Sequence, residues 1–247
     1  MMKNTLLGLI LASLATAAFA ETWRIESPDH RVAVVELYTS EGCSSCPPAD
    51  AWLAELAGLP KGELDALVLA LHVDYWDRLG WKDPYARAEY SERQRRLARL
   101  NRQRTLYTPE FLVDGKETQG TRRIIERIKQ ANAEPAAMKL QLQVERDPRQ
   151  LRLTLTSPEA AGKNWNARFV VYEDGIVSEV ESGENAGQRL EHERVVRHLG
   201  PALPLAGGLS RRIPLSPQWQ PQNLGVGVLV EDEDGRYLQA LDFRFPS

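Results

Sequence analysis

The most informative part of the chain is residues 32–46, with the sequence VAVVELYTSEGCSSC. Its first seven residues are apolar except for Glu36, and their β-branched and aromatic side chains are typical of a buried strand. The next four residues favour a turn, and Cys43 and Cys46 follow at once. The pattern therefore predicts a strand that ends in a loop with two cysteines, separated by two residues.

Beyond the cysteines, predicted helices and strands alternate. Helical spacing of apolar residues and strong helix formers predict helices over 50–57 and 85–104, and a third helix is expected to end near residue 131. Strands are expected at 66–73 and 111–113. An order in which strands alternate with helices is typical of an α/β fold.

From Met138 onward, the period of the apolar residues changes to two. Alternating apolar residues on both sides of a turn at 147–149 predict a β-hairpin. Further strands are expected at 168–172, 194–198, 226–231 and 237–245. The pattern predicts a second, all-β domain of the sandwich type over residues 135–247, which follows a first domain at 21–134.

The first twenty residues have the pattern of a signal peptide. Lys3 supplies a positive charge, residues 6–18 are almost wholly apolar, and Ala18-Phe19-Ala20 has the small-x-small form of a cleavage site. The apolar run is short for a membrane span, which takes about 20 residues. We therefore expect a periplasmic or secreted protein that meets the membrane only through a cleaved signal peptide.

The composition narrows the possible partners. The chain has 43% hydrophobic and 26% charged residues, as a folded globular protein does, and its formal net charge is −3. Because no excess of positive charge attracts phosphate backbones, nucleic acid is not expected as a partner. No Gly-rich phosphate loop is present, and no cofactor is expected.

The two cysteines are the candidate reactive groups. Two thiols at this spacing can form a disulfide and exchange it with a partner, in a compartment that permits disulfides. Backbone N–H groups at the start of the next helix would stabilise the thiolate of Cys43, so we predict that Cys43 attacks and Cys46 resolves the mixed disulfide. Glu36 is a candidate proton acceptor for Cys46 if it is buried, and otherwise it faces solvent. The predicted function is thiol–disulfide exchange with a protein or small-molecule substrate that carries a thiol or a disulfide.

Other functions remain open. Cys43 and Cys46, together with His72 on the neighbouring strand, would suit Cu(I) or Zn, which would make the protein a soft-metal binding protein or carrier. A non-catalytic interaction module with a structural disulfide is the third reading. His192 and His198 flank a predicted strand, but no nearby cysteine or carboxylate pattern completes a metal site there.

Residues 34–46 resemble the thioredoxin fold, and so does Tyr107-Thr108-Pro109 before a predicted strand. The resemblance implies that Pro109 is a cis-proline beside the cysteine pair and that Thr108 presents its backbone to a substrate strand. Both residues thus become candidates for the substrate site.

The chain more closely resembles a family of exported bacterial proteins, classified as a domain of unknown function with a thioredoxin-like core. The motifs that carry the resemblance are SEGCSSCPPAD at 40–50, VDYWD at 73–77 and GWKDP at 80–84. The resemblance implies an α/β thioredoxin-like domain with a helical insert, followed by an all-β sandwich-like domain.

Overall fold

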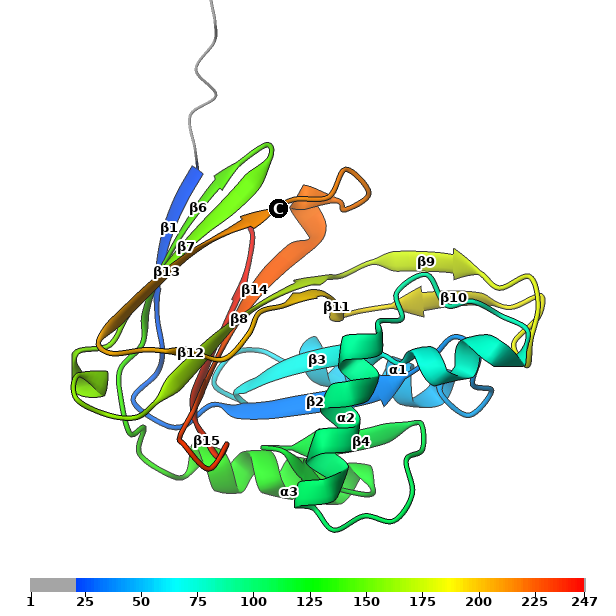
Figure 1. Cartoon of the computed structure of the whole chain (residues 1–247), viewed down its shortest axis with the longest axis horizontal. Helices are drawn as coiled ribbons and strands as arrows, with labels where there is room; N and C mark the ends of the chain where they lie inside the picture. Colours follow the sequence, from blue (N-terminus) through cyan, green and yellow to red (C-terminus); the bar gives the residue numbers. More distant parts are fainter. Residues whose placement is uncertain (1–20, 247) are drawn as a thin grey trace, which may run out of the picture.

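β-Sheets dominate the computed structural model, which describes residues 21–246 (Figure 1). The predicted signal peptide, residues 1–20, lies outside the described residues. Among the described residues, 39% lie in strands and 21% in helices. None of the helices in this part of the chain is long and apolar enough to cross a membrane.

The main sheet has nine strands and takes them from both halves of the chain. Its strands, in spatial order, are β15 (Tyr237–Arg244), β14 (Leu224–Glu231), β8 (Asn166–Glu173), β11 (Val195–Leu199), β3 (Ala66–His72), β2 (Ala33–Thr39), β4 (Glu110–Val113) and β5 (Lys116–Glu117), with β12 (Leu203–Pro204) paired to β8. β3 is parallel to both of its neighbours, β2 and β11, and the other pairs are antiparallel. The parallel pair β2–β3 lies near the centre of the sheet.

The expected fold class, an α/β thioredoxin-like domain followed by an all-β sandwich-like domain, is wrong. The protein is mostly β-sheet, with several sheets and few helices. The alternation of strands and helices up to residue 131 suggested a self-contained α/β unit, but the edge of β3 pairs with β11, and β8, β14 and β15 extend the sheet further. A free edge would expose a row of unpaired backbone N–H and C=O groups. The pairing with β11 gives backbone groups on that edge of β3 hydrogen-bond partners.

A four-stranded antiparallel sheet packs on the C-terminal part of the main sheet. Its strands, in order, are β1 (Glu21–Glu26), β6 (Gln141–Asp147), β7 (Gln150–Thr156) and β13 (Gly208–Pro214). The apolar residues of β6 and β7 alternate as predicted, and they form one core with the apolar residues of β8, β14 and β15. Short 3₁₀ helices at Pro158–Ala160 and Pro221–Asn223 occupy connections in this half of the chain.

Helices cover both faces of β2 and β3. The face formed by Ala33, Val35 and Leu37 packs against α1 (Pro47–Ala57) and α3 (Thr121–Asn132). The face with Val34 and Tyr38 packs against α2 (Ala88–Leu100), which follows the 3₁₀ helix η1 (Asp74–Leu79). Since strand side chains alternate between faces, each residue of β2 belongs to one of these two cores.

A separate two-stranded hairpin reaches the end of the main sheet where the cysteines lie. It consists of β9 (Ile176–Glu179) and β10 (Arg189–His192). Figure 1 shows the hairpin extending beyond the main sheet toward the loop that follows β2. The hairpin therefore brings residues from the second half of the chain to the cysteine loop.

Candidate functional site

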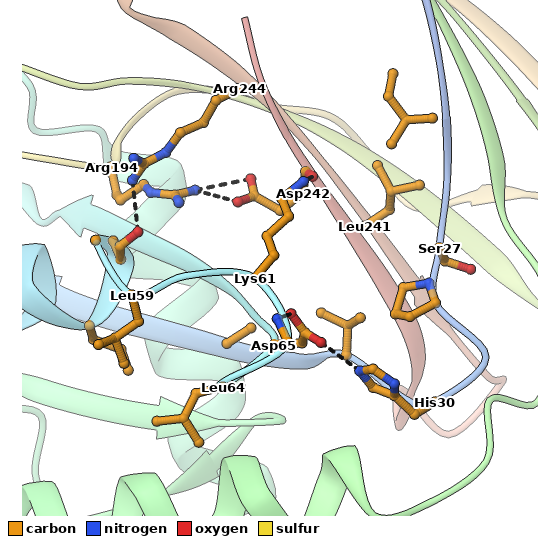
Figure 2. Close-up of a pocket in the computed structure, with 18 of the residues that line it drawn as sticks. Ser27, His30, Leu59, Lys61, Leu64, Asp65, Arg194, Leu241, Asp242 and Arg244 are labelled. Atoms are coloured by element: carbon orange, nitrogen blue, oxygen red, sulfur yellow. Dashed lines mark hydrogen bonds and ion pairs between the residues drawn. The ribbon is translucent and has the colours of Figure 1, made fainter. Parts of the chain in front are cut away.

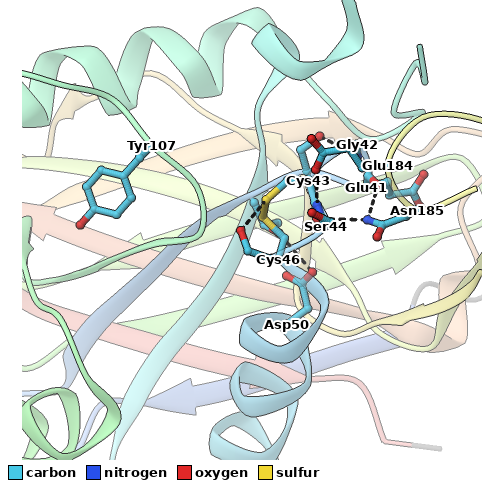
Figure 3. The surroundings of a disulfide bond; sticks show 12 residues. Glu41, Gly42, Cys43, Ser44, Cys46, Asp50, Tyr107, Glu184 and Asn185 are labelled. Carbon is cyan, nitrogen blue, oxygen red and sulfur yellow. Dashed lines mark hydrogen bonds between the residues drawn. A yellow bond between two sulfur atoms is a disulfide. The ribbon is translucent and has the colours of Figure 1, made fainter. Parts of the chain in front are cut away.

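Cys43 and Cys46 form a disulfide at the start of α1 (Figure 3). Both cysteines have no exposed surface, whereas Ser44 and Ser45 between them are exposed. The hydroxyl of Ser45 lies 3.3 Å from the sulfur of Cys43. The loop therefore presents two serines to solvent and keeps the sulfur atoms beneath them.

The helix N-terminus does not supply N–H groups to Cys43 in the way expected from the sequence. α1 starts at Pro47 and Pro48, which have no N–H to donate. The N–H groups of Ala49 and Asp50 both donate to the carbonyl oxygen of Cys46, at 2.8 and 3.0 Å. Proline is favoured in the first turn of a helix, where its missing N–H is not needed by the helix itself. The polar side chain next to the Cys43 sulfur is the hydroxyl of Ser45.

The tip of the β9–β10 hairpin covers the cysteine loop. The fully buried Asn185 amide donates to the carbonyl oxygens of Glu41, at 2.8 Å, and Cys43, at 3.0 Å. The N–H of Ser44 donates to the carboxylate of Glu184 at 2.9 Å. In Figure 3, both hairpin residues approach the loop from the same side. Residues about 140 positions apart in the sequence thus build one wall of the site.

Two histidines beside the loop are each held by a buried carboxylate. His72 at the end of β3 donates from Nδ1 to Asp83 at 2.7 Å, and His192 at the end of β10 donates from Nε2 to Glu41 at 3.0 Å. The ring centroids of the two histidines are 5.1 Å apart. His72 Nε2 and His192 Nδ1 are buried and have no hydrogen-bond partner in the described protein. In each histidine, therefore, one ring nitrogen is hydrogen-bonded to a carboxylate and the other has no hydrogen-bond partner.

The charge of Asp83 determines the protonation of His72. Burial favours the neutral ring, but the charge and hydrogen bond of Asp83, with smaller contributions from Asp50 and Glu41, outweigh it and raise the pKa of His72. Burial likewise acts to raise the pKa of Asp83, but His72 and two backbone N–H donors lower it overall. The pair is therefore stabilised as imidazolium and carboxylate.

Asp50 lies one helical turn after Cys46 and is buried. Its Oδ2 accepts a hydrogen bond from Thr39 at 3.1 Å, whereas its Oδ1 has no partner among the described residues. Burial raises the pKa of Asp50, although His72, His192 and the Thr39 hydroxyl act in the opposite direction. Figure 3 shows the Asp50 carboxyl group beneath the cysteine loop. A raised pKa brings a carboxyl group closer to the pKa of a thiol, so Asp50 is better suited to exchange a proton with a cysteine.

The structure does not bring Glu36, the proton acceptor suggested by the sequence, to Cys46. Glu36 is buried on the face of β2 that packs against α2, whereas α1, which follows Cys46, covers the other face. Its carboxylate accepts hydrogen bonds from Arg93 Nε at 2.7 Å and from the Tyr237 hydroxyl at 3.2 Å. Both carboxylate oxygens are thus engaged away from the disulfide.

Thr108 and Pro109 lie at the same end of the sheet as the cysteines. The peptide bond between them is cis. They directly precede β4, whose first residue, Glu110, pairs with Tyr38 near the end of β2. The two residues therefore run beside the segment that leads from β2 to Cys43.

Sequence reasoning missed the acidic residues of the site. Asp50 and Asp83 lie within the sequence motifs of the resemblance, and Glu41 precedes Gly42 in the same loop. Asp50 could have been found, because it lies among the apolar residues of a predicted helix. Burial of an unpaired carboxyl group is unfavourable, so its presence there indicates a specific role. No local pattern indicated that His192 would join them, because its position depends on the hairpin.

A concave region lies at the opposite ends of β2 and β3 (Figure 2). This pocket has a volume of about 660 Å³ and combines leucine side chains with charged residues. Its charges pair with one another, since Arg194 binds Asp242 at 2.9 Å and His30 contacts Asp65 at 2.7 Å. Because the pocket lies at the other end of β2 and β3, it is separate from the disulfide. In the described part of the chain, no three His, Cys, Asp or Glu side chains are arranged to hold a metal ion.

The chain is similar in fold to two solved structures. Protein AGR_C_4864 from Agrobacterium tumefaciens superposes with a TM-score of 0.65 at 22% identity, over 88% of this chain and 96% of that one. HBP35 of Porphyromonas gingivalis superposes with a TM-score of 0.59 at 16% identity, over 87% of this chain and 75% of that one. No curated protein sequence matches this chain significantly. Residues 34–231 match the profile of the family described as protein of unknown function DUF1223, so the chain belongs to that family.

Proposed function

We propose that this protein exchanges disulfides with protein substrates through Cys43 and Cys46, after export to the periplasm or the cell exterior. The observation that carries the proposal is the Cys43–Cys46 disulfide placed beside buried acidic and histidine side chains. A disulfide that closes so short a loop restricts the unfolded chain little, so stability alone is a poor reason for it. Exchange chemistry gives both the cysteines and their neighbours a role.

The reaction has two steps, with Cys43 as the first nucleophile. The Cys43 thiolate attacks one sulfur of a substrate disulfide, a new S–S bond forms, and the first substrate thiolate leaves. The Cys46 thiolate then attacks the sulfur of Cys43, and the second substrate thiolate leaves. The cysteine pair loses two electrons and the substrate disulfide gains them, and the reverse sequence oxidises a substrate dithiol.

Two features around the disulfide fit this reaction. The Ser45 hydroxyl, 3.3 Å from the Cys43 sulfur, can donate a hydrogen bond to a thiolate there. Thr108 and Pro109 border the same end of the sheet and can shape a substrate site. Because both cysteines are fully buried, the residues around them must move before a substrate sulfur reaches Cys43.

The decisive experiment measures the reduction potential of the cysteine pair in the mature protein, equilibrated with glutathione buffers. We expect a midpoint between about −120 and −270 mV, the range of known exchange enzymes. In addition, reduced Cys46→Ser should form a stable mixed disulfide with a peptide disulfide through Cys43, and Cys43→Ser, the matched control, should form less of it.

Two results would overturn the proposal. A disulfide that stays closed below about −300 mV would indicate a structural bridge. A pair that never oxidises, but binds Cu(I) or Zn stoichiometrically when reduced, would indicate a soft-metal carrier instead.

A further inference from the structure

The buried polar atoms beside the disulfide are incompletely paired. Asp50 Oδ1, His72 Nε2 and His192 Nδ1 are each buried and make no hydrogen bond to the described protein. A buried polar atom without a partner destabilises a fold, and titratable side chains of this kind next to a disulfide are typical of a functional site. The three side chains lie where α1, β3 and β10 meet.

The three side chains are also electrostatically coupled. The charges of His72 and His192 both act on Asp50, and those of Asp50 and Glu41 both act on His72. Asp83 acts on Asp50 in the opposite sense to the histidines. A proton gained by Asp50 therefore changes the pKa of His72, and a proton gained by His72 changes that of Asp50.

We propose that Asp50 accepts the proton of the Cys46 thiol during the resolving step. This inference rests on the proposed exchange function and adds a residue to it. In the step, the S–H bond of Cys46 breaks and its proton moves to the Asp50 carboxylate. The Cys46 thiolate attacks Cys43, and Asp50 then returns the proton to the departing substrate thiolate.

The geometry assigns this role to Asp50 rather than to Glu36. Asp50 follows Cys46 by one turn of α1, and its backbone N–H donates to the Cys46 carbonyl oxygen at 3.0 Å. Glu36 lies on the other face of β2, with Arg93 and Tyr237 on its two oxygens. Among the described residues, Asp50 is the one carboxylate near the cysteine loop with a buried, unpaired oxygen.

The experiment separates the two chemical steps with 5,5′-dithiobis(2-nitrobenzoate) as the substrate. Attack by Cys43 on this reagent releases a first thionitrobenzoate, and resolution by Cys46 releases a second. The rates of both phases are followed from pH 5 to pH 9 in wild type, Asp50→Asn and His192→Gln. Asp114→Asn is the matched control, because Asp114 is a half-buried aspartate whose pKa is also raised by burial, at the opposite end of β2.

We expect Asp50→Asn to slow the second phase about tenfold or more at pH 7, as loss of a general base does. The pH midpoint of that phase should move toward about 8.5, the value of an unassisted thiol. His192→Gln should move the midpoint upward by less, because His192 is only one of several influences that lower the pKa of Asp50. The first phase should keep its wild-type rate in each variant, and Asp114→Asn should change neither phase.

The two phases also distinguish the possible failures. A wild-type protein without the first phase would contradict the exchange function itself. A normal first phase, with an unchanged pH profile of the second phase in both Asp50→Asn and His192→Gln, would overturn the role of Asp50 alone. If Asp50→Asn does not fold, the His192→Gln profile decides the outcome.

Discussion

Two buried groups of charged side chains lie against opposite faces of the β2–β3 pair, and they differ in how completely they are paired. On the α2 face, both oxygens of Glu36 are bonded, to Arg93 and Tyr237. On the α1 face, Asp50 and two histidines each keep one unpaired polar atom. In the first group, each carboxylate oxygen accepts a hydrogen bond. In the second group, each of the three titratable side chains has one polar atom without a partner.

This difference supports the proposed distinction between a structural group around Glu36 and a group around Asp50 that takes part in exchange. A buried ion pair whose hydrogen bonds are satisfied fixes side chains in one arrangement, and removal of one partner leaves an uncompensated charge. A partly paired group of titratable residues is more typical of a functional site, especially next to a disulfide. The two groups should therefore respond differently to substitution.

The largest expected effect on stability is at Arg93. Arg93→Met leaves the Glu36 carboxylate buried without its cation, and we expect it to lower the free energy of unfolding by about 3–5 kcal/mol. Urea denaturation measures this loss. The double variant Glu36→Gln/Arg93→Met should regain much of it, and the reduction potential of the disulfide should not change. If Arg93→Met lowers the free energy of unfolding only as much as loss of an exposed ion pair does, Glu36 takes up a proton easily when Arg93 is absent.

The His72–Asp83 pair should give a pH-dependent effect of intermediate size. We expect Asp83→Asn to cost about 2 kcal/mol of unfolding free energy near pH 5, the contribution of a hydrogen bond to a charged group. The folded pKa of His72 is raised above 6.5, so its share of the stability is complete below pH 6.5 and is lost as the pH rises through the folded pKa. The folded pKa of Asp83 is lowered below 3.8, so its share is lost only as the pH falls through that lower value.

Urea denaturation of wild type and Asp83→Asn from pH 3 to pH 9 tests this prediction. The difference between the two proteins should be greatest between about pH 4 and pH 6.5 and shrink at higher pH. A difference that stays constant up to pH 9 would mean that His72 is neutral in the folded protein.

The smallest expected effect on stability is at the hairpin tip. Asn185→Ala removes two amide donors from the carbonyl oxygens of Glu41 and Cys43, and we expect a loss of about 1 kcal/mol. Reduction of the disulfide by dithiothreitol should become faster, because the cysteine loop loses two hydrogen bonds that hold it in place. Thiol alkylation followed by mass measurement gives this rate.

Glu184→Gln is the control for the hairpin, because it keeps an acceptor oxygen for the N–H of Ser44 at an exposed position. Its reduction rate should stay close to that of wild type. An Asn185→Ala protein that is reduced no faster than Glu184→Gln would show that the tip does not limit access.

Local sequence patterns predicted several elements well. The strands expected at 32–38 and 66–73 correspond to β2 and β3, and the predicted hairpin corresponds to β6 and β7. Strongly apolar or strictly alternating runs are sufficient for such predictions. β1, β13 and the β9–β10 hairpin were not predicted, because these strands are exposed on one side and rich in polar residues.

The sequence by itself determined the cysteine spacing, the buried strand before it and the proximity of Thr108 and Pro109 to a following strand, since these depend on neighbouring residues. Only the tertiary structure decided that the main sheet joins both halves of the chain and that His192 and Asn185 lie at the cysteine loop. It also placed Glu36 and Asp50 against opposite faces of β2. Contacts between distant segments depend on which strand edges and faces meet, and local periodicity does not specify those partners.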